Sequence, residues 1–274
     1  MAELTLRRPM NHPPPMPENR PWFVGMVHLE PLPGSPAYAG DFEAVIGRAA
    51  EDAISLAEGG VDAIMVENYH DAPFYKASLG PETVAALTRC ALSVKQAADA
   101  VRGGISLGIN ALRNDGPAAL AIALATGARF IRINVLTGAM VTDQGLIEGC
   151  AADLLRMKQQ LGAEISILAD VQVKHAAPLA DLPREQAVAD AVHRGRADAL
   201  IASGTGTGQP TDPQQVEAYK VAAPGVPILV GSGTTVETVK TLGAHGYIVG
   251  TALKERGRIS VDRVKAMREA IAGQ

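Results

Sequence analysis

PILVGSGTT at residues 227–235 and GYIVGTALK at residues 246–254 are the two stretches that decide the fold of this chain. Each is a short apolar run that breaks into glycine and small hydroxyl residues, a pattern typical of a buried strand followed by a turn. Glycine lets main-chain N–H groups approach an anion without a Cβ in the way, and Thr234 and Thr251 add hydroxyl donors. Loops of this kind after the last two strands of an eight-stranded α/β barrel commonly bind phosphate. The predicted phosphate ligands are Gly231, Ser232, Gly233, Gly250 and Thr251.

The segment after Gly233 has helical spacing over residues 234–240, so we expect a helix whose first amides point into the same loop. A helix N-terminus favours an anion through its free N–H groups and its dipole. The alternative is that the glycines only make tight strand-to-helix turns. Two such loops in succession, each ending an apolar run, favour anion binding.

The same succession of apolar run, polar turn and helical pattern repeats along the chain without a domain break. A (β/α)8 barrel takes about 250 residues, which suits a chain of 274. We predict an α/β protein with a single TIM barrel over residues 21–274 and an extended, proline-rich arm over residues 1–20. A doubly wound open sheet is the alternative, but it needs a glycine-rich turn after its first strand, where this chain has prolines. Besides the two quoted runs, the expected strands span residues 22–29, 63–67, 105–110, 130–135, 165–171 and 199–202, with a polar loop at 136–145; the expected helices span 42–58, 81–101, 117–127, a segment ending near 161, 183–193, a segment from 213, 234–240 and 261–271.

Composition narrows the function classes. The chain is 47% hydrophobic and 20% charged, with a formal net charge of −4 and no basic run, so nucleic-acid binding is not expected. Cys90 and Cys150 lie in predicted helices without metal-ligand spacing and are expected to be free thiols in a reducing compartment. No apolar run is long enough to span a bilayer, and the first residues lack an apolar signal core. We expect a cytoplasmic, soluble protein, with peripheral membrane association left open.

Polar and charged residues follow the ends of the predicted strands, which face one shared mouth in a barrel of this kind. An unpaired carboxylate in such a mouth costs several kcal/mol, so it needs a partner or a substrate. The residues at these positions are His28, Glu30, Glu67, Asn68, Asn110, Arg132, Asn134, Asp170, Lys174, His175, Ser203 and Thr205.

Glu67 and Asp170 are the predicted general acid and base, because partial burial between strand ends raises the pKa of a carboxylate toward the working range. In the alternative, one of them is the structural ion-pair partner of Arg132. His28 is a candidate proton shuttle or metal ligand, or else a hydrogen-bonded core residue. Lys174 is a candidate Schiff-base lysine, although it lies beyond its strand. The predicted substrate-binding side chains are Asn68, Asn110, Arg132, Asn134, Ser203 and Thr205.

Cofactors are left open. His28, Glu67, Asp170 and His175 could converge on a divalent metal only in three dimensions, since no HxH or HExxH spacing is present, and no metal ligand is assigned. The glycines at residues 204–208 alternate without the GxGxxG offset, so we interpret this segment as a flexible loop that could close over a ligand. FMN is the minority alternative as the group that carries the phosphate.

Several motifs of the chain match one known family. They are GMVHLEPLPGSP at residues 25–36, MVEN at 65–68, RIN at 132–134, ADV at 169–171, SGTGTG at 203–208 and GSG at 231–233. From about residue 23 to residue 271 the chain resembles the BtpA family, which is grouped with ribulose-phosphate-binding barrels. The resemblance implies a TIM barrel. It also links the chain to a namesake implicated in photosystem I biogenesis with peripheral attachment to photosynthetic membranes, and to relatives associated with sugar metabolism. The reaction of the family is unassigned, so the resemblance assigns no catalytic residue.

The sequence therefore favours an enzyme that acts on a small phosphorylated, sugar-derived metabolite by isomerisation, aldol-type cleavage or glycosidic cleavage. The alternative is a non-enzymatic biogenesis or assembly factor that uses the barrel as a scaffold; a homo-oligomer is left open. Both glycine-rich loops and the acidic strand ends must open into one cavity if the first hypothesis is correct.

Overall fold

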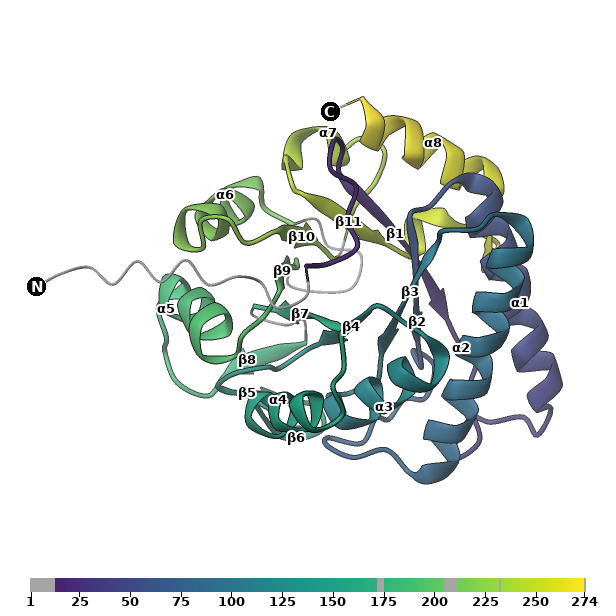
Figure 1. Ribbon diagram of the computed structural model, residues 1–274, viewed down its shortest axis with the longest axis horizontal. Helices are drawn as coiled ribbons and strands as arrows, with labels where there is room; N and C mark the ends of the chain where they lie inside the picture. The colour runs from purple at the N-terminus through teal and green to yellow at the C-terminus, as the bar shows by residue number, and fades with distance from the viewer. Residues whose placement is uncertain (1–12, 172–174, 205–210, 232, 274) are drawn as a thin grey trace, which may run out of the picture.

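Short runs of branched and small apolar residues form the strands of a closed parallel barrel, with helices around it (Figure 1). This computed structural model describes residues 13–171, 175–204, 211–231 and 233–273. Around the barrel the strands follow the order β1-β11-β10-β9-β7-β4-β3-β2, so the first and last strands pair and close it. The predicted TIM barrel is confirmed. Its eight strands are β1 (Trp22–His28), β2 (Ala63–Glu67), β3 (Ser106–Asn110), β4 (Phe130–Ile133), β7 (Ser166–Asp170), β9 (Ala199–Ala202), β10 (Ile228–Val230) and β11 (Gly246–Val249).

Caps predictable from the sequence set several helix boundaries. Asp41 accepts a hydrogen bond from the Ala44 amide at the start of the first helix, and Gly60 ends that helix at φ +91°. Asp115 caps the third helix in the same way through the Ala118 amide. The helices are α1 (Phe42–Gly59), α2 (Pro81–Val101), α3 (Gly116–Thr126), α4 (Ala151–Gln160), α5 (Arg184–Ala189) with a π-helical turn (Asp190–Arg194), α6 (Pro213–Ala222), α7 (Val239–Leu242) and α8 (Val261–Ala272).

The helix predicted over residues 234–240 is wrong, since α7 begins only at Val239. The Thr235 amide donates to Thr238 Oγ1 at 2.8 Å, and the Thr238 amide donates to Thr235 Oγ1 at 3.3 Å. Thr238 Oγ1 also donates to the Gly233 carbonyl at 3.3 Å. Because these side chains satisfy the local backbone groups, they compete with helical hydrogen bonds. The regular helix therefore begins five residues later than predicted, after a turn in which the Val239 amide donates to the Thr235 carbonyl at 3.0 Å.

The polar loop predicted at residues 136–145 is also wrong. It forms a hairpin of β5 (Ala139–Thr142) and β6 (Gly145–Glu148), joined by β8 (Ala176–Pro178) into a three-stranded antiparallel sheet. Val135 and Ile147 pack under this sheet with Met140. The strands are too short for a clear alternating pattern, and the pairing of β5 with β8 joins distant parts of the chain. The last quoted stretch likewise leaves the barrel, through a 3-10 turn (Thr251–Leu253) into a hairpin of β12 (Lys254–Glu255) and β13 (Arg258–Ile259).

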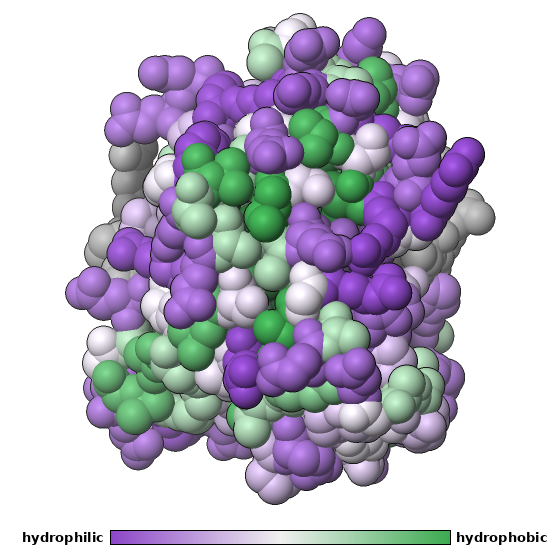
Figure 2. All heavy atoms as spheres, turned by 90° about the vertical axis from the view of Figure 1, so that its right-hand side faces the viewer, coloured by the Kyte–Doolittle hydropathy of each residue, from purple (hydrophilic) through white to green (hydrophobic). Residues whose placement is uncertain are grey.

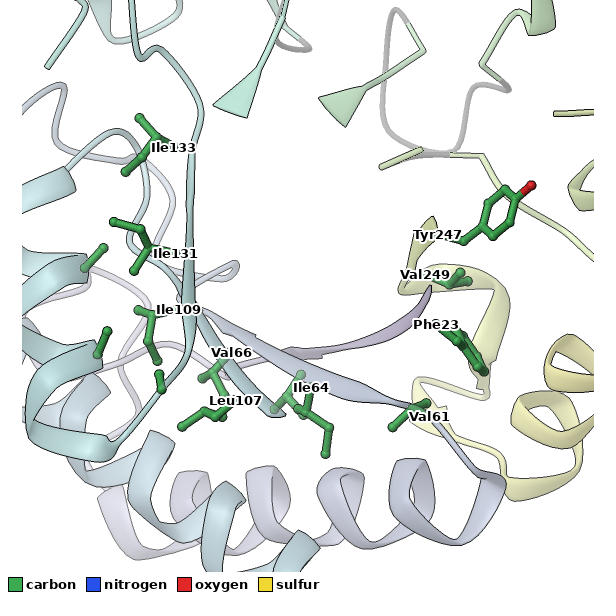
Figure 3. Packing of buried hydrophobic residues seen from close by; sticks show 14 of the residues in the cluster. Phe23, Val61, Ile64, Val66, Leu107, Ile109, Ile131, Ile133, Tyr247 and Val249 are labelled. Carbon is green, nitrogen blue, oxygen red and sulfur yellow. The ribbon is translucent and has the colours of Figure 1, made fainter. Parts of the chain in front are cut away.

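Alternate strand residues build two apolar layers. Outward-facing side chains such as Ile64, Val66 and Leu107 point toward the helices (Figure 3) and belong to the large outer core. Inward-facing residues, including Trp22, Met65 and Phe130, fill the barrel itself. This period of two is the expected consequence of the strand pleat.

The arm enters at the end of the barrel where the strands begin. Met16 packs against the inner core, and both terminal nitrogens of Arg20 lie 2.7 Å from the Asp62 carboxylate oxygens. Over residues 13–20 the arm has no helix or strand, as its prolines predict; residues 1–12 lie outside the described part. This end of the barrel is therefore closed by the arm.

The face that carries α1 and α2 mixes hydrophilic residues with small groups of hydrophobic ones (Figure 2). Ile54 of α1 and Leu92 of α2 are exposed hydrophobic residues of these helices. Within the described residues, none of the helices combines the length and apolar character that crossing a bilayer demands.

Candidate active site in the barrel mouth

A cavity of about 760 Å³ lies at the end of the barrel where the strands finish. Its wall includes His28 at the end of β1 and Glu67 at the end of β2. It also includes residues from both glycine-rich loops, namely Gly231, Gly233, Thr234, Gly250 and Thr251. The glycine-rich loops and Glu67 thus share one opening, whereas Asp170, the other predicted acidic strand end, is not among the lining residues.

One glycine has a different role from the predicted one. The Gly231 amide donates to the Ala202 carbonyl at 2.9 Å, so this N–H group is used within the barrel wall. A Cβ at Gly231 would lie 2.6 Å from Ile201 Cγ2 and 3.7 Å from Arg132 Nη2. Gly231 therefore provides space beside Arg132. Ser232, the neighbouring predicted phosphate ligand, lies outside the described residues.

The remaining donors of the two loops belong to residues of the cavity wall and have no protein partner within the described part of the chain. Thr234 is 4% exposed, and its hydroxyl has no hydrogen-bond partner within the described residues. In that part of the chain the amides of Gly233, Thr234, Gly250 and Thr251 also donate to no protein acceptor. A buried hydroxyl without a partner costs free energy. Its position beside unused amides is suited to the oxygens of an anion.

His28 stands between the second loop and Glu67. Its Nε2 lies 3.6 Å from Glu67 Oε2, and Lys254 Nζ lies 3.3 Å from its Nδ1. Tyr69 stacks on the ring with centroids 4.4 Å apart and planes 24° apart. A Cβ at Gly250 would lie 2.7 Å from His28 Cε1. The predicted proton shuttle is therefore held in the cavity wall with a carboxylate on one nitrogen and an ammonium on the other.

Asp170 is enclosed by hydrogen-bond donors. Arg132 Nε and Nη2 each lie 3.0 Å from one of its oxygens, Asn134 Nδ2 donates at 2.8 Å, and Ser203 Oγ donates at 3.3 Å. The Asp170 side chain is fully buried. Burial lowers the pKa of Arg132, but the Asp170 carboxylate outweighs burial and raises that pKa above its usual value. The alternative of a structural ion pair therefore describes Asp170. Glu67 and Glu30 are the carboxylates among the described lining residues; Glu67 is buried, whereas the Glu30 side chain is 46% exposed and lies 3.8 Å from Arg48.

The other predicted binding residues divide into two groups. Arg132 and Asn134 line the cavity. Asn68 instead receives the Leu112 amide at 2.7 Å and donates to Asp71 at 3.1 Å. Asn110 donates to the Arg132 carbonyl and to Asn134 Oδ1, both at 3.2 Å. Asn68, Asn110 and Ser203 are not part of the described wall, and they support the residues that are. Lys174 and Thr205 lie outside the described residues.

Sequence reasoning missed several residues of the wall. Arg113 is 9% exposed, and burial lowers the pKa of its guanidinium while the Asp170 carboxylate opposes this. A charged residue so soon after β3 is a signal that could have identified it. Tyr69, His70 and Phe74 form an aromatic part of the wall, and none of the motifs singled out in the sequence includes them. Lys254 is not in the described wall but contacts its His28; it was in the quoted stretch and was read as part of a strand run.

A metal site is not formed by the described residues. Among them, no group of three or more His, Cys, Asp or Glu side chains could hold a metal ion. His175 lines the same cavity, yet the suggested convergence of His28, Glu67, Asp170 and His175 is not found there.

Comparison with known proteins gives consistent results. The model of the BtpA family matches residues 19–273. The chain is 48% identical over 255 residues to the photosystem I biogenesis protein BtpA of Synechocystis sp., covering 91% of this chain and 87% of that one. It is 45% identical over 258 residues to an uncharacterized protein of Thermococcus kodakarensis, covering 92% and 95% of the two chains.

Solved structures match the fold at low sequence identity. Phosphoribosyl anthranilate isomerase from Thermococcus kodakaraensis superposes with a TM-score of 0.55 at 14% identity, covering 93% of this chain and 100% of that one. KGPDC from Streptococcus mutans gives a TM-score of 0.55 at 13% identity, with 92% and 98% covered. At these identities the likeness concerns the barrel.

Proposed function

The chain belongs to the BtpA family, and we propose that it is an enzyme that binds a small phosphorylated, sugar-derived metabolite in the barrel mouth and acts on it by acid–base chemistry. The observation that carries the proposal is the pairing of two features in one cavity. One wall contains Thr234, whose buried hydroxyl has no partner within the described residues, together with loop amides that donate to no described acceptor. The same cavity contains the His28 and Glu67 side chains.

In this proposal the phosphate group of the ligand binds at the two glycine-rich loops that follow β10 and β11. Hydrogen bonds from neutral donors to an ionised group are stronger than those between neutral groups. The Thr234 hydroxyl and the amides of Gly233, Gly250 and Thr251 are such donors. Arg132 adds positive charge beside Gly231, although Asp170 offsets much of it. A phosphate ester at this position directs the rest of the molecule toward His28 and Glu67.

Glu67 and His28 are the groups that move protons. A carboxylate takes a proton from carbon or oxygen, and an imidazole beside it donates or accepts at a second atom. Glycosidic cleavage uses two carboxylates flanking the bond, and Asp170 is committed to Arg132 here. A Glu67 carboxylate beside a His28 imidazole therefore favours isomerisation or aldol-type cleavage over glycosidic cleavage.

The cavity is large for a bare sugar phosphate. Its volume of about 760 Å³ lies within the range that holds drug-sized ligands. The wall also contains apolar and aromatic residues, among them Pro31, Tyr69, Phe74 and Leu112. A substrate that carries an apolar group in addition to its phosphorylated sugar would cover this wall.

The test measures binding and turnover separately. Isothermal titration with inorganic phosphate, ribose 5-phosphate and a panel of larger sugar phosphates is carried out on the wild-type protein and on Thr234→Val and Glu67→Gln. Loss of one hydrogen bond to a charged group should weaken phosphate binding about 10- to 100-fold in Thr234→Val. Glu67→Gln should bind as the wild type does and should not turn the ligand over.

Thr126→Val is the matched control, because Thr126 is also 4% exposed but donates to the Ile122 carbonyl inside α3. It should leave phosphate affinity unchanged. If no phosphorylated compound binds the wild-type protein, or if Thr234→Val binds as tightly as the wild type, the proposal is wrong.

A non-enzymatic role in assembly is the second candidate, because the Synechocystis relative is named a photosystem I biogenesis protein. A scaffold does not need the unpartnered donors of the cavity. Complementation of a strain lacking that relative distinguishes the two roles. If Thr234→Val and Glu67→Gln restore photosystem I as fully as the wild-type chain, the scaffold is favoured.

A further inference from the structure

Lys254 is not explained by phosphate binding or by the barrel core. It is the first residue of β12, half-buried, and its ammonium lies 3.3 Å from His28 Nδ1. The two residues are 226 positions apart in the sequence. A contact over this separation depends on the pairing of β1 with β11, which brings the two ends of the barrel sheet together.

The contact determines where His28 carries its proton. An ammonium group has only hydrogens to donate, so the nitrogen that faces it must accept with its lone pair. A neutral imidazole with a lone pair on Nδ1 carries its proton on Nε2. Nε2 is the nitrogen that faces Glu67, at 3.6 Å. A second proton on Nδ1 would point at the ammonium and would be repelled by it.

Lys254 acts from the segment that also forms the second anion-binding loop. Gly250 and Thr251 provide amides to the cavity, and the 3-10 turn (Thr251–Leu253) leads directly to Lys254. Gly250 itself lies against the His28 ring, where a Cβ would be 2.7 Å from Cε1 and 3.1 Å from Nε2. Residues 250–254 therefore contact both the proposed phosphate position and two sides of the imidazole.

We propose that Lys254 is a positioning residue that keeps the His28 imidazole neutral with its proton on Nε2, facing Glu67, and that residues 250–254 couple anion binding to this arrangement. The first clause stands on the contacts alone, and the second rests on the proposed function. In this arrangement Glu67 takes a proton from the substrate while His28 Nε2 donates one. Interactions at the phosphate end would then act on the reacting groups as well as on affinity.

The test is a histidine titration by NMR on the full-length, 15N-labelled protein, with the His28 ring signals assigned by a His28→Gln variant. Among the described residues, the charged or titratable groups that contact the ring include Lys254 from β12, Glu67 from β2 and Tyr69 from the segment after β2. The wild-type ring should show the Nε2–H tautomer at neutral pH. In Lys254→Met it should take up its second proton at a pH higher by at least about one unit, because a nearby positive charge is removed.

Two further variants separate positioning from general disturbance. Lys254→Arg keeps a cationic donor and should retain most of the wild-type titration. Lys240→Met removes an exposed lysine of α7 and should change nothing. A wild-type His28 that carries its proton on Nδ1, or a Lys254→Met titration identical to that of the wild type, would overturn the first clause.

Addition of inorganic phosphate tests the coupling. We expect shifts in the amide signals of Gly233, Thr234 and Thr251 together with shifts of the His28 ring signals. Amide shifts without any response of the His28 ring would overturn the coupling and leave the phosphate site intact. Absence of amide shifts would contradict the proposed function and the coupling, whereas the titration of Lys254→Met would still decide the role of Lys254.

Discussion

The two ends of the barrel are built from the same strands but treat polar groups in opposite ways. Where the strands begin, Asp62 accepts from Arg20, Arg268 and the Phe23 amide, at 2.7 to 3.1 Å. In the same way Asp198 accepts from the Ile167 amide at 2.8 Å. Where the strands finish, the Thr234 hydroxyl and several amides belong to residues that line the cavity and have no protein partner within the described residues. At the closed end the Trp22 indole N–H also lacks a partner among these residues, but the carboxylates of that end are used for stability, whereas the open end keeps several donors for a ligand.

This difference reflects how polar groups at each end of the barrel affect stability and ligand binding. A carboxylate that caps the first amide of a neighbouring strand satisfies two polar groups at once. A donor that is left unpartnered costs stability, which is a frequent feature of functional sites. The mouth also contains one fully satisfied cluster, the Arg132–Asp170 pair with Asn134 and Ser203. Four predictions test the comparison.

The largest expected effect concerns the satisfied cluster of the mouth. Asp170→Ala leaves the Arg132 guanidinium buried without its carboxylate and should lower the free energy of unfolding by about 3–5 kcal/mol, measured by urea denaturation. Asp99→Ala is the control, since Asp99 belongs to an exposed pair with Lys95 and should cost less than about 0.5 kcal/mol. A loss below about 1 kcal/mol for Asp170→Ala would mean that the pair does not stabilise the mouth.

The next effect concerns the apolar wall of the mouth. Phe74→Ala removes a half-buried aromatic side chain that lines the cavity. Loss of this contact should weaken binding of a phosphorylated ligand that carries an apolar ring by about 1–2 kcal/mol, or roughly 5- to 30-fold. Inorganic phosphate should bind unchanged. Equal losses of affinity for the apolar ligand and for inorganic phosphate in calorimetric titration would contradict the assignment of the apolar group and the phosphate to different parts of the cavity.

A smaller effect of opposite sign is expected at Thr234. Thr234→Val replaces an unpartnered buried hydroxyl with a methyl group and should raise the free energy of unfolding by about 1 kcal/mol in the absence of ligand. Thr126→Val removes a satisfied hydroxyl of equal burial and should lower it by about 1 kcal/mol. Chemical denaturation of the two variants side by side gives the comparison, and destabilisation by Thr234→Val would show that its hydroxyl has a structural partner.

The smallest effect is expected at the closed end. Burial raises the pKa of Asp62, but the hydrogen bonds from Arg20 and from the Phe23 amide, together with Arg268, outweigh burial and lower that pKa. Because Arg20 is 38% exposed, Arg20→Ala should cost only about 0.5–1 kcal/mol. Phosphate binding at the other end should be unaffected.

The cost of Arg20→Ala should depend on pH. A carboxylate whose folded pKa is lowered contributes stability above its unfolded pKa of about 3.9 and loses that contribution as pH falls through the folded pKa. The difference between the wild type and Arg20→Ala should therefore be constant from pH 5 to 7, taken as an approximate working range, and should shrink below about pH 4. A difference that grows in acid would show that another group carries the pH dependence.

Local sequence patterns were sufficient for most of the framework. The helix expected over residues 42–58 begins at Phe42, where Asp41 caps it, and ends at Gly59, one residue beyond the predicted position. The polar ends of β1, β2 and β10 were identified as one mouth, because parallel strands of a barrel finish on the same side. The failures are at Thr235 and Thr238, where side chains compete with a helix, and at β5 and β8, where the pairing joins distant parts of the chain.

What the sequence determined by itself is the closed barrel and the set of residues at its mouth, since both depend on residue order and on the period of apolar residues along each strand. The tertiary structure decided which of those residues are already bound to other groups of the protein. It assigned Asp170 to Arg132, used the Gly231 amide for Ala202, and brought Lys254 to His28. The physical reason is that these contacts join strands and loops far apart in the chain. Their distances depend on how the strands are staggered when the barrel closes, which no local pattern encodes.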